Sequence, residues 1–281
     1  MAAKLALAVP ALGCTPARLL NAVITEDGYR IERDIPYGRG PRHRLDIYIP
    51  DDVTSDASVA VFFYGGRWSY GSKADYLFVG QALASRGIVA AVVDYRLYPE
   101  VRFPAFIEDG AKAVGWVKRH IAEHGGHAGR IFLIGHSAGA HIAAMLSLDP
   151  TFLAAEDVLI DDISGLIGLA GPYDFLPIED PTVKEIFDVD GLAATQPISH
   201  VRAQAPRTLL LTGAKDVTVL PRNSLHLHAA LSHHAGGAAD LKIYPYIGHV
   251  GIVLAFASPF RWLAPTLNDV IAFIERANTS A

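Results

Sequence analysis

Residues 131–144 read IFLIGHSAGAHIAA, and this stretch decides the fold. Four apolar residues lead into a GxSxG pentapeptide, made here by Gly135, Ser137 and Gly139, and an Ala-rich, helix-favouring run follows. The pattern predicts a strand, a tight turn and a helix. In such a nucleophile elbow the serine stands at a strained apex, and small residues two before and two after it let strand and helix approach. A plain Gly-rich connection that holds a serine is the alternative, and the apolar strand and the helix around it favour the elbow.

The composition is that of a chain with a large core. It has 281 residues, of which 51% are apolar, and α/β chains of this size often form one domain. There are 24 basic and 29 acidic residues, a net charge of −5, and no long basic run, so we expect a small-molecule partner and no nucleic acid. The single cysteine, Cys14, makes no internal disulfide. The oligomeric state is left open, with a homodimer as one alternative.

The N-terminal arm, residues 1–28, has two interpretations. Lys4 precedes an apolar run from Leu5 to Gly13 that ends at Cys14, which resembles a degenerate lipobox of bacterial lipoproteins. The alternative is an amphipathic arm packed near the mouth of the site. We therefore expect the protein in the cytoplasm, or in the cell envelope if the arm is processed at Cys14. No run reaches the roughly 18 apolar residues that span a bilayer.

The chain from residue 29 onward predicts eight strands. Tyr29 to Pro36 and Arg44 to Pro50 alternate polar and apolar residues around 38-GRGP-41, which favours an antiparallel hairpin with one wet face. Apolar runs typical of buried strands follow at 59–64, 88–93, 131–134, 163–170, 207–212 and 241–246. Helical spacing separates or follows them at 73–86, 106–123, 221–233 and 265–277, and after the elbow.

This alternation predicts a single α/β domain over residues 29–281. Right-handed crossovers require a mostly parallel sheet with helices on both faces. An irregular stretch at about residues 175–206 is expected to be a small, lid-like insertion over the carboxyl edge of the sheet.

An open α/β sheet binds its ligands beyond the carboxyl ends of the strands, so the loops after the strands carry the site. After the third strand the chain reads 64-YGGRW-68. The bare amides of Gly65 and Gly66, together with that of Ala138, are in place to converge on one oxygen and to form an oxyanion hole. An ordinary Gly-Gly turn is the alternative, and the position directly after a buried strand favours the oxyanion hole.

A serine nucleophile needs a base, and the base needs an acid to orient it. In this architecture the acid and the histidine follow the serine along the chain. Of the twelve histidines, His249 has the right order and the right loop, just past the last strand. Asp216 follows the preceding strand, and Asp174 is the competing acid. We favour Asp216, because a strand next to that of the histidine needs the shortest reach.

The neighbours of these loops are the candidate substrate-binding residues: Tyr64, Arg67, Trp68 and His136. The sequence has no phosphate loop, no dinucleotide fingerprint and no zinc-ligand spacing, so no cofactor or metal is predicted.

Four segments together resemble one known family: 64-YGGRW-68, 94-DYRLYPE-100 with 103-FPA-105, 135-GHSAGAH-141 and 197-PISH-200. The set resembles the α/β-hydrolase superfamily, in its esterase and lipase branch with an HGG-type oxyanion loop, which includes carboxylesterases and kynurenine formamidase-like enzymes. The likeness covers about residues 29 to 277. Tyr64 departs from it, because the family usually has histidine there.

The resemblance implies an α/β-hydrolase fold with an eight-stranded, mostly parallel sheet. It also implies a triad of Ser137, Asp216 and His249, and an oxyanion hole from the amides of Gly65, Gly66 and Ala138. The function that follows is a serine carboxylesterase that works through an acyl-enzyme. We expect short acyl chains, because no long interfacial helix is visible and the insertion is modest. The alternatives are an amidase such as N-formylkynurenine formamidase and a non-catalytic small-molecule-binding protein on the same fold.

Overall fold

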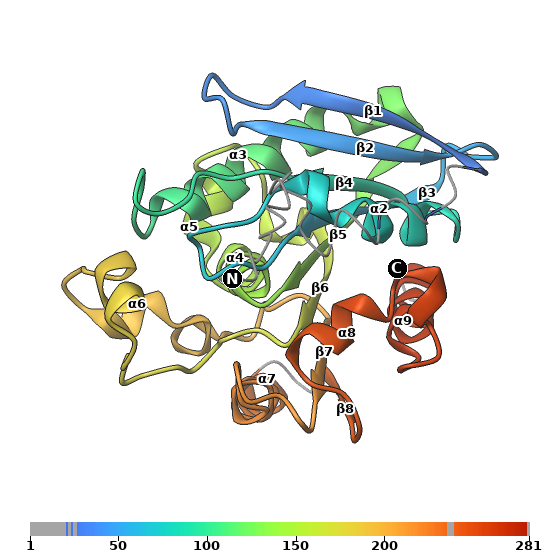
Figure 1. Cartoon of the computed structure of the whole chain (residues 1–281). Coiled ribbons are helices and arrows are strands. Elements are labelled where there is room, and N and C mark those ends of the chain that lie inside the picture. Colours follow the sequence, from blue (N-terminus) through green and yellow to red (C-terminus); the bar gives the residue numbers. More distant parts are fainter. Residues whose placement is uncertain (1–20, 22–23, 25–26, 235–238, 280–281) are drawn as a thin grey trace, which may run out of the picture.

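The computed structural model describes Asn21, Ile24 and residues 27–234 and 239–279, so most of the predicted arm, Cys14 included, lies outside the described residues. A single eight-stranded sheet runs through the described part in the order β1-β2-β4-β3-β5-β6-β7-β8 (Figure 1). The β1–β2 and β2–β4 pairs are antiparallel and the other pairs are parallel. The strands are β1 (Tyr29–Pro36), β2 (Arg44–Pro50), β3 (Ala57–Phe63), β4 (Val89–Val93), β5 (Gly126–His136), β6 (Ile163–Leu169), β7 (Thr208–Gly213) and β8 (Ala239–Tyr244).

Helices cover both faces of this sheet (Figure 1). Helices α2 and α9 lie on one face, and α3, α4 and α7 lie on the other. The α-helices are α2 (Leu77–Ala84), α3 (Ala105–His120), α4 (Ala138–Leu148), α5 (Pro150–Ala154), α6 (Pro181–Ile186), α7 (Arg222–His234), α8 (His249–Leu254) and α9 (Thr266–Thr279). Short 3₁₀ helices are η1 (Lys73–Tyr76), η2 (Ile121–His124), η3 (Ile160–Asp162), η4 (Leu192–Thr195), η5 (Pro197–His200) and η6 (Ser258–Phe260). The predicted fold class is confirmed.

Most strands follow the hydrophobic pattern closely. The exception is β8, expected as a buried strand at 241–246: it spans 239–244, forms one edge of the sheet and has only Tyr244 buried. Every residue of β3 and β4 is buried, as expected of parallel strands covered on both faces. The predicted hairpin has the predicted bounds. β1 is half exposed because it forms the other edge of the sheet, but β2 is buried along almost its whole length, so the expected wet face is confined to β1. An irregularity in its register occurs between Glu32 and Ile35, where Asp34 has a φ of 57°.

A buried lysine connects this hairpin to the 3₁₀ helix η1, which follows β3. Lys73 is only 6% exposed, and its Nζ donates to Asp46 at 2.6 Å and to Asp34 at 2.7 Å. Its backbone N–H donates to Asp94 at 2.7 Å. These contacts fix the start of the segment expected as one helix over 73–86. The structure instead has the 3₁₀ helix η1 followed by α2, since Lys73 is held at both its backbone and its side chain.

The lid-like insertion, residues 175–206, contains α6, η4 and η5. Its aromatic side chains pack inward: Phe187 is fully buried, 4.7 Å from the ring of Trp68, and Phe175 is 6.0 Å from the same ring. Its role as a lid stays a prediction.

Candidate active site

The turn between β5 and α4 has the strained geometry that the GxSxG pattern predicts. Ser137 has a φ of 56° and a ψ of −122°, which few non-glycine residues adopt. A Cβ on Gly135 would lie 2.2 Å from the carbonyl oxygen of Gly139, and a Cβ on Gly139 would lie 2.0 Å from that of Phe63. Both glycines are therefore required for strand and helix to approach, and the serine is held at the apex.

Ser137, His249 and Asp216 are joined by two hydrogen bonds, each 2.8 Å long. The Nδ1 of His249 contacts Oδ2 of Asp216, and its Nε2 contacts Oγ of Ser137. A carboxylate only accepts, so Nδ1 carries the proton and donates, and the bare Nε2 accepts from the serine hydroxyl. This is the arrangement in which a histidine can take the proton of a serine.

Two backbone hydrogen bonds hold the carboxylate of Asp216 in place. The side chain of Asp216 is fully buried, and its Oδ1 accepts from the backbone N–H groups of Thr218 and Val219 at 2.9 Å each. The competing Asp174 instead contacts the half-exposed His226 at 2.6 Å. The structure therefore brings Asp216 to His249, across the neighbouring strands β7 and β8.

His136 holds the backbone of His249. Its Nε2 lies 3.0 Å from the carbonyl oxygen of His249, which can only accept, so Nε2 donates. Burial, followed by the nearby His249 ring, lowers the pKa of His136 to about 3. The ring therefore stays neutral at physiological pH. A neutral ring places no second positive charge beside His249.

The three predicted oxyanion donors lie around the serine. Gly65 packs so closely that a Cβ there would lie 2.9 Å from the Cβ of Ser137. Gly65, Gly66 and Ser137 line the same cavity. Ala138 is the first residue of α4, so its amide is among those at the helix N-terminus that have no partner within the helix.

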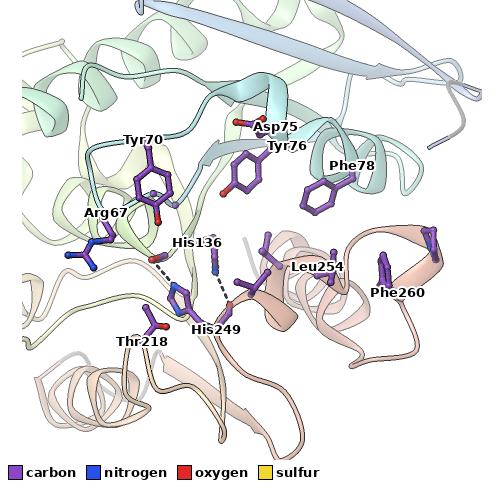
Figure 2. A pocket seen from close by; sticks show the side chains of 16 residues that line it. Arg67, Tyr70, Asp75, Tyr76, Phe78, His136, Thr218, His249, Leu254 and Phe260 are labelled. Atoms are coloured by element: carbon purple, nitrogen blue, oxygen red, sulfur yellow. Dashed lines mark hydrogen bonds between the residues drawn. The ribbon is translucent and has the colours of Figure 1, made fainter. Parts of the chain in front are cut away.

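A cavity of about 670 Å³ opens beside the serine. Figure 2 shows Tyr76 and Phe78 of the η1–α2 segment facing Leu254 of α8 and Phe260 of η6 across it. His136 and His249 lie to the left of Leu254 and Phe260 in this view. Most of its walls are hydrocarbon, while Arg67 and Asp75 also contribute to its lining. The walls come from elements far apart in the sequence: Gly65, Gly66, Arg67, Tyr70, Asp75, Tyr76, Phe78, His136, Ser137, Thr218, His249, Val250, Val253, Leu254, Pro259 and Phe260.

The predicted substrate-binding residues divide into two pairs. Arg67 and His136 line the cavity. Tyr64 and Trp68 do not: both are buried, at 0% and 4% exposure, and neither is among the residues that line the cavity.

Sequence reasoning missed several residues of the cavity. Helical spacing placed Tyr76 and Phe78 on a helix, with no signal that they face a ligand. Leu254 belongs to α8, which lies outside the helices that the sequence predicts.

Within residues 27–234 and 239–279, no three His, Cys, Asp or Glu side chains gather as ligands for a metal ion. In the same part of the chain, no helix is both long and apolar enough to cross a membrane.

The family of this chain follows from comparison with known proteins. Residues 45–231 match the BD-FAE family, and the chain belongs to this family, an esterase-type group with the α/β-hydrolase fold. A probable isoprenylcysteine alpha-carbonyl methylesterase from rice (Oryza sativa subsp. japonica) is 33% identical over 79% of the chain and 57% of the relative. The probable carboxylic ester hydrolase LipM of Mycobacterium tuberculosis is 31% identical over 73% of the chain and 52% of LipM.

Solved structures agree on the fold. Esterase B from Lactobacillus rhamnosis, with a bound phosphonate inhibitor, superposes with a TM-score of 0.81 at 16% identity. The match covers 94% of this chain and 91% of the esterase. By contrast, the chain spans only 57% of the rice relative.

Proposed function

We propose that this chain hydrolyses carboxylic esters through an acyl-enzyme on Ser137. The observation that carries the proposal is the continuous hydrogen-bonded chain from Ser137 through His249 to Asp216 at the edge of an apolar cavity. The names of the relatives, which include a methylesterase and a carboxylic ester hydrolase, support the same chemistry.

The chemistry takes place in two similar halves. His249 Nε2 removes the hydroxyl proton while Ser137 Oγ attacks the carbonyl carbon, and the carbonyl oxygen becomes an oxyanion. The amides of Gly65, Gly66 and Ala138 receive that oxyanion. The tetrahedral intermediate collapses, and the alcohol leaves with the proton held by His249. Water then attacks the acyl-enzyme by the same route and releases the acid.

The acyl group is short, as the sequence predicts, and we infer that the cavity receives the alcohol part. The leaving oxygen must lie beside His249, which protonates it. The helix that begins at His249 continues into the cavity wall with Val250, Val253 and Leu254. A volume of about 670 Å³ is in the range that holds drug-sized ligands and far exceeds an acetyl group. The expected substrate is a short-chain ester of a large apolar alcohol.

Replacing Ser137 by alanine tests the mechanism. We expect kcat for p-nitrophenyl acetate to fall on the order of a millionfold, with the thermal unfolding midpoint preserved. Fluorophosphonate should label the wild type and not the variant. Unlabelled wild-type protein would favour a binding protein on this fold, and faster turnover of N-formyl amides than of acetyl esters would favour an amidase.

The choice of acid has its own matched pair of variants. Asp216→Asn should lower kcat by about 10⁴-fold, because the amide leaves the imidazole in the wrong tautomer. Asp174→Asn should leave kcat within twofold. A loss in the second variant and none in the first would assign the role to Asp174.

Two ester series test the substrate. Across ethyl, hexyl and 1-naphthyl acetate, kcat/KM should rise with the size of the alcohol. Across 1-naphthyl acetate, butyrate and octanoate, it should fall with the length of the acyl chain. The opposite trends would place the acyl group in the cavity and contradict the inference.

A further inference from the structure

The oxyanion loop, residues 64–68, has a strained backbone. Gly66, Arg67 and Trp68 follow one another with φ values of +140°, +51° and +56°. A Cβ on Gly66 would lie 2.0 Å from the carbonyl oxygen of Tyr70, so the chain folds tightly back on itself. Non-glycine residues with positive φ persist only where surrounding contacts hold them. The contacts that hold this loop therefore decide where its amides point.

One set of contacts begins at Tyr64, the residue that departs from the family pattern. Its ring is fully buried and stacks on Tyr95 at 4.7 Å and on Tyr76 at 5.5 Å. Its carbonyl oxygen accepts from the hydroxyl of Tyr95 at 2.7 Å. Its own hydroxyl accepts from Nη2 of Arg42 at 2.5 Å. Hydrogen bonds therefore hold both the backbone carbonyl group and the side-chain hydroxyl group of Tyr64.

Arg42 connects the oxyanion loop, and the residues just after it, to the β1–β2 hairpin. It lies in the turn between β1 and β2, and its Nη2 also donates to the carbonyl oxygen of Gly71 at 2.8 Å. Its Nε donates to the carbonyl oxygen of Tyr95 at 2.7 Å. A guanidinium holds its donors in one rigid plane, which suits it to fix several acceptors at once. Arg42 thus binds Tyr64 at the start of the loop, Gly71 just beyond the end of the loop, and Tyr95, which follows β4.

A buried carboxylate completes the group. Asp94 Oδ1 lies 3.6 Å from Nη2 of Arg42 and accepts from the backbone N–H of Lys73. Burial raises the pKa of Asp94, while its hydrogen bonds with the Lys73 amide and with Tyr64, and the charge of Arg42, act in the opposite direction. Asp94 therefore lies close enough to Arg42 to form an ion pair with its guanidinium.

We propose that Arg42 and Tyr64 are positioning residues that hold the oxyanion loop against Ser137 and so align its amides with the developing oxyanion. The inference rests on the proposed ester hydrolysis. Neither residue lines the cavity, so neither touches the substrate there. Gly65 follows Tyr64 directly and is packed against Ser137, so a shift of the tyrosine moves the donors relative to the nucleophile.

The expected signature is a loss of kcat with little change in KM. Oxyanion donors act on the charge of the transition state, and removing one costs on the order of 10²–10³-fold in kcat. Donors that are misaligned rather than removed still stabilise the oxyanion in part, so the loss of kcat should be smaller. We therefore expect Tyr64→Phe, which keeps the stacked ring and removes the acceptor, to lower kcat for p-nitrophenyl acetate about tenfold. We expect Arg42→Gln to lower it further.

A trifluoromethyl ketone is the decisive probe, because it forms an oxyanion on the serine without turnover. Its affinity should fall in parallel with kcat/KM across the variants. Since the hydrogen bond between Tyr64 and Arg42 is lost in both single variants, the double variant should lose less than the product of the two single losses. Tyr37→Phe is the matched control: its hydroxyl donates to the carbonyl oxygen of Asp94, outside the loop, and kcat should stay within twofold.

The outcomes separate the two proposals. If turnover survives Ser137→Ala, the proposed function fails. If turnover depends on Ser137 but both Tyr64→Phe and Arg42→Gln keep kcat and ketone affinity within twofold, the positioning role alone is overturned. A loss found only in KM, or equally in Tyr37→Phe, would also overturn it. Thermal melts of every variant establish that folded proteins are compared.

Discussion

Two regions lie near the carboxyl edge of the sheet, and they use their apolar side chains differently. The insertion, residues 175–206, turns Phe175 and Phe187 against Trp68 and His141. The cavity wall, formed by η1–α2 and α8–η6, turns its apolar side chains toward the space beside Ser137. No residue of the insertion is among those that line the cavity in the described part of the chain.

The comparison assigns the two regions different roles: the insertion contributes to the stability of the fold, and the cavity wall to the choice of substrate. The irregular sequence of the insertion predicts a lid over the carboxyl edge of the sheet, whereas the cavity is lined by elements of ordinary hydrophobic pattern. We therefore expect changes in the insertion to alter the free energy of unfolding. Changes in the cavity wall should alter which ester is hydrolysed. The ratio of kcat/KM for 1-naphthyl acetate to that for ethyl acetate, here called the size ratio, distinguishes the two effects.

The largest effect is expected from Phe187→Ala. The ring is fully buried among aromatic side chains, and truncating a buried phenylalanine costs about 3–5 kcal/mol of unfolding free energy. Urea unfolding measures this loss. The size ratio should stay within twofold. A changed size ratio with unchanged stability would make the insertion part of the substrate site.

The next effect depends on pH and involves His141, whose Nε2 donates to the carbonyl oxygen of Thr195 in η4 at 2.8 Å. Burial lowers the pKa of His141 to about 4, below that of an unfolded histidine. The unfolded chain therefore binds the proton more readily, and stability is lost as the pH falls from about 6.5 toward 4. At pH 5 the loss is about 2 kcal/mol relative to pH 8 for this one residue.

His141→Gln removes the titrating group and keeps an N–H donor. Unfolding free energies of wild type and variant at pH 8 and pH 5 give the comparison, and the acid-induced loss should be smaller in the variant by about 2 kcal/mol. Equal acid sensitivity in the two proteins would contradict the burial argument. The partial loss that remains is expected from the buried His136, whose pKa is also lowered.

A smaller and more specific effect is expected from Leu254→Trp in the cavity wall. The larger ring fills space that an apolar alcohol would occupy, so the size ratio should fall about tenfold. The matched control is Leu225→Trp on α7, where the leucine is 44% exposed and does not line the cavity. A size ratio that falls equally in the control would place the apolar group elsewhere.

The smallest effect is expected at an ion pair that connects the insertion to the oxyanion loop. Arg67 donates to Asp180, the N-cap residue of α6, at 2.5 Å, and this hydrogen bond lowers the pKa of Asp180. Both side chains are more than 40% exposed, and exposed pairs contribute little to stability. Asp180→Asn keeps a capping oxygen, so the melting midpoint and the size ratio should not change measurably. A clear rise in activity toward large esters would instead support a lid that this pair keeps closed.

Much of the fold was accessible to sequence reasoning because its signals are local. Continuous apolar runs predicted the buried strands, and the hairpin was predicted with its correct bounds. The glycines of GxSxG predicted the elbow, since their close approaches follow from the turn itself. The helix expected at 73–86 was wrong in detail, because contacts of Lys73 with a distant hairpin tighten its first turn.

The site was predicted only as far as chain order allows. Order and strand position placed Ser137, Asp216 and His249 in neighbouring loops, and the structure brings them within hydrogen-bonding distance. The contacts of Arg42 had no signal, because its position in a Gly- and Pro-rich turn is typical of any solvated arginine. The placement of Tyr64 as a buried residue, away from the cavity, was equally invisible.

The sequence by itself determined the parallel sheet, the strained serine and the candidates for its base and acid. Periodicity, glycine placement and chain order can all be read directly from the order of the residues. Only the tertiary structure decided that Asp216 rather than Asp174 meets His249, that Arg42 reaches the oxyanion loop and that α8 borders the cavity. Each of these depends on how separate loops pack at one edge of the sheet. That packing is set by the whole core and not by any single stretch of the chain.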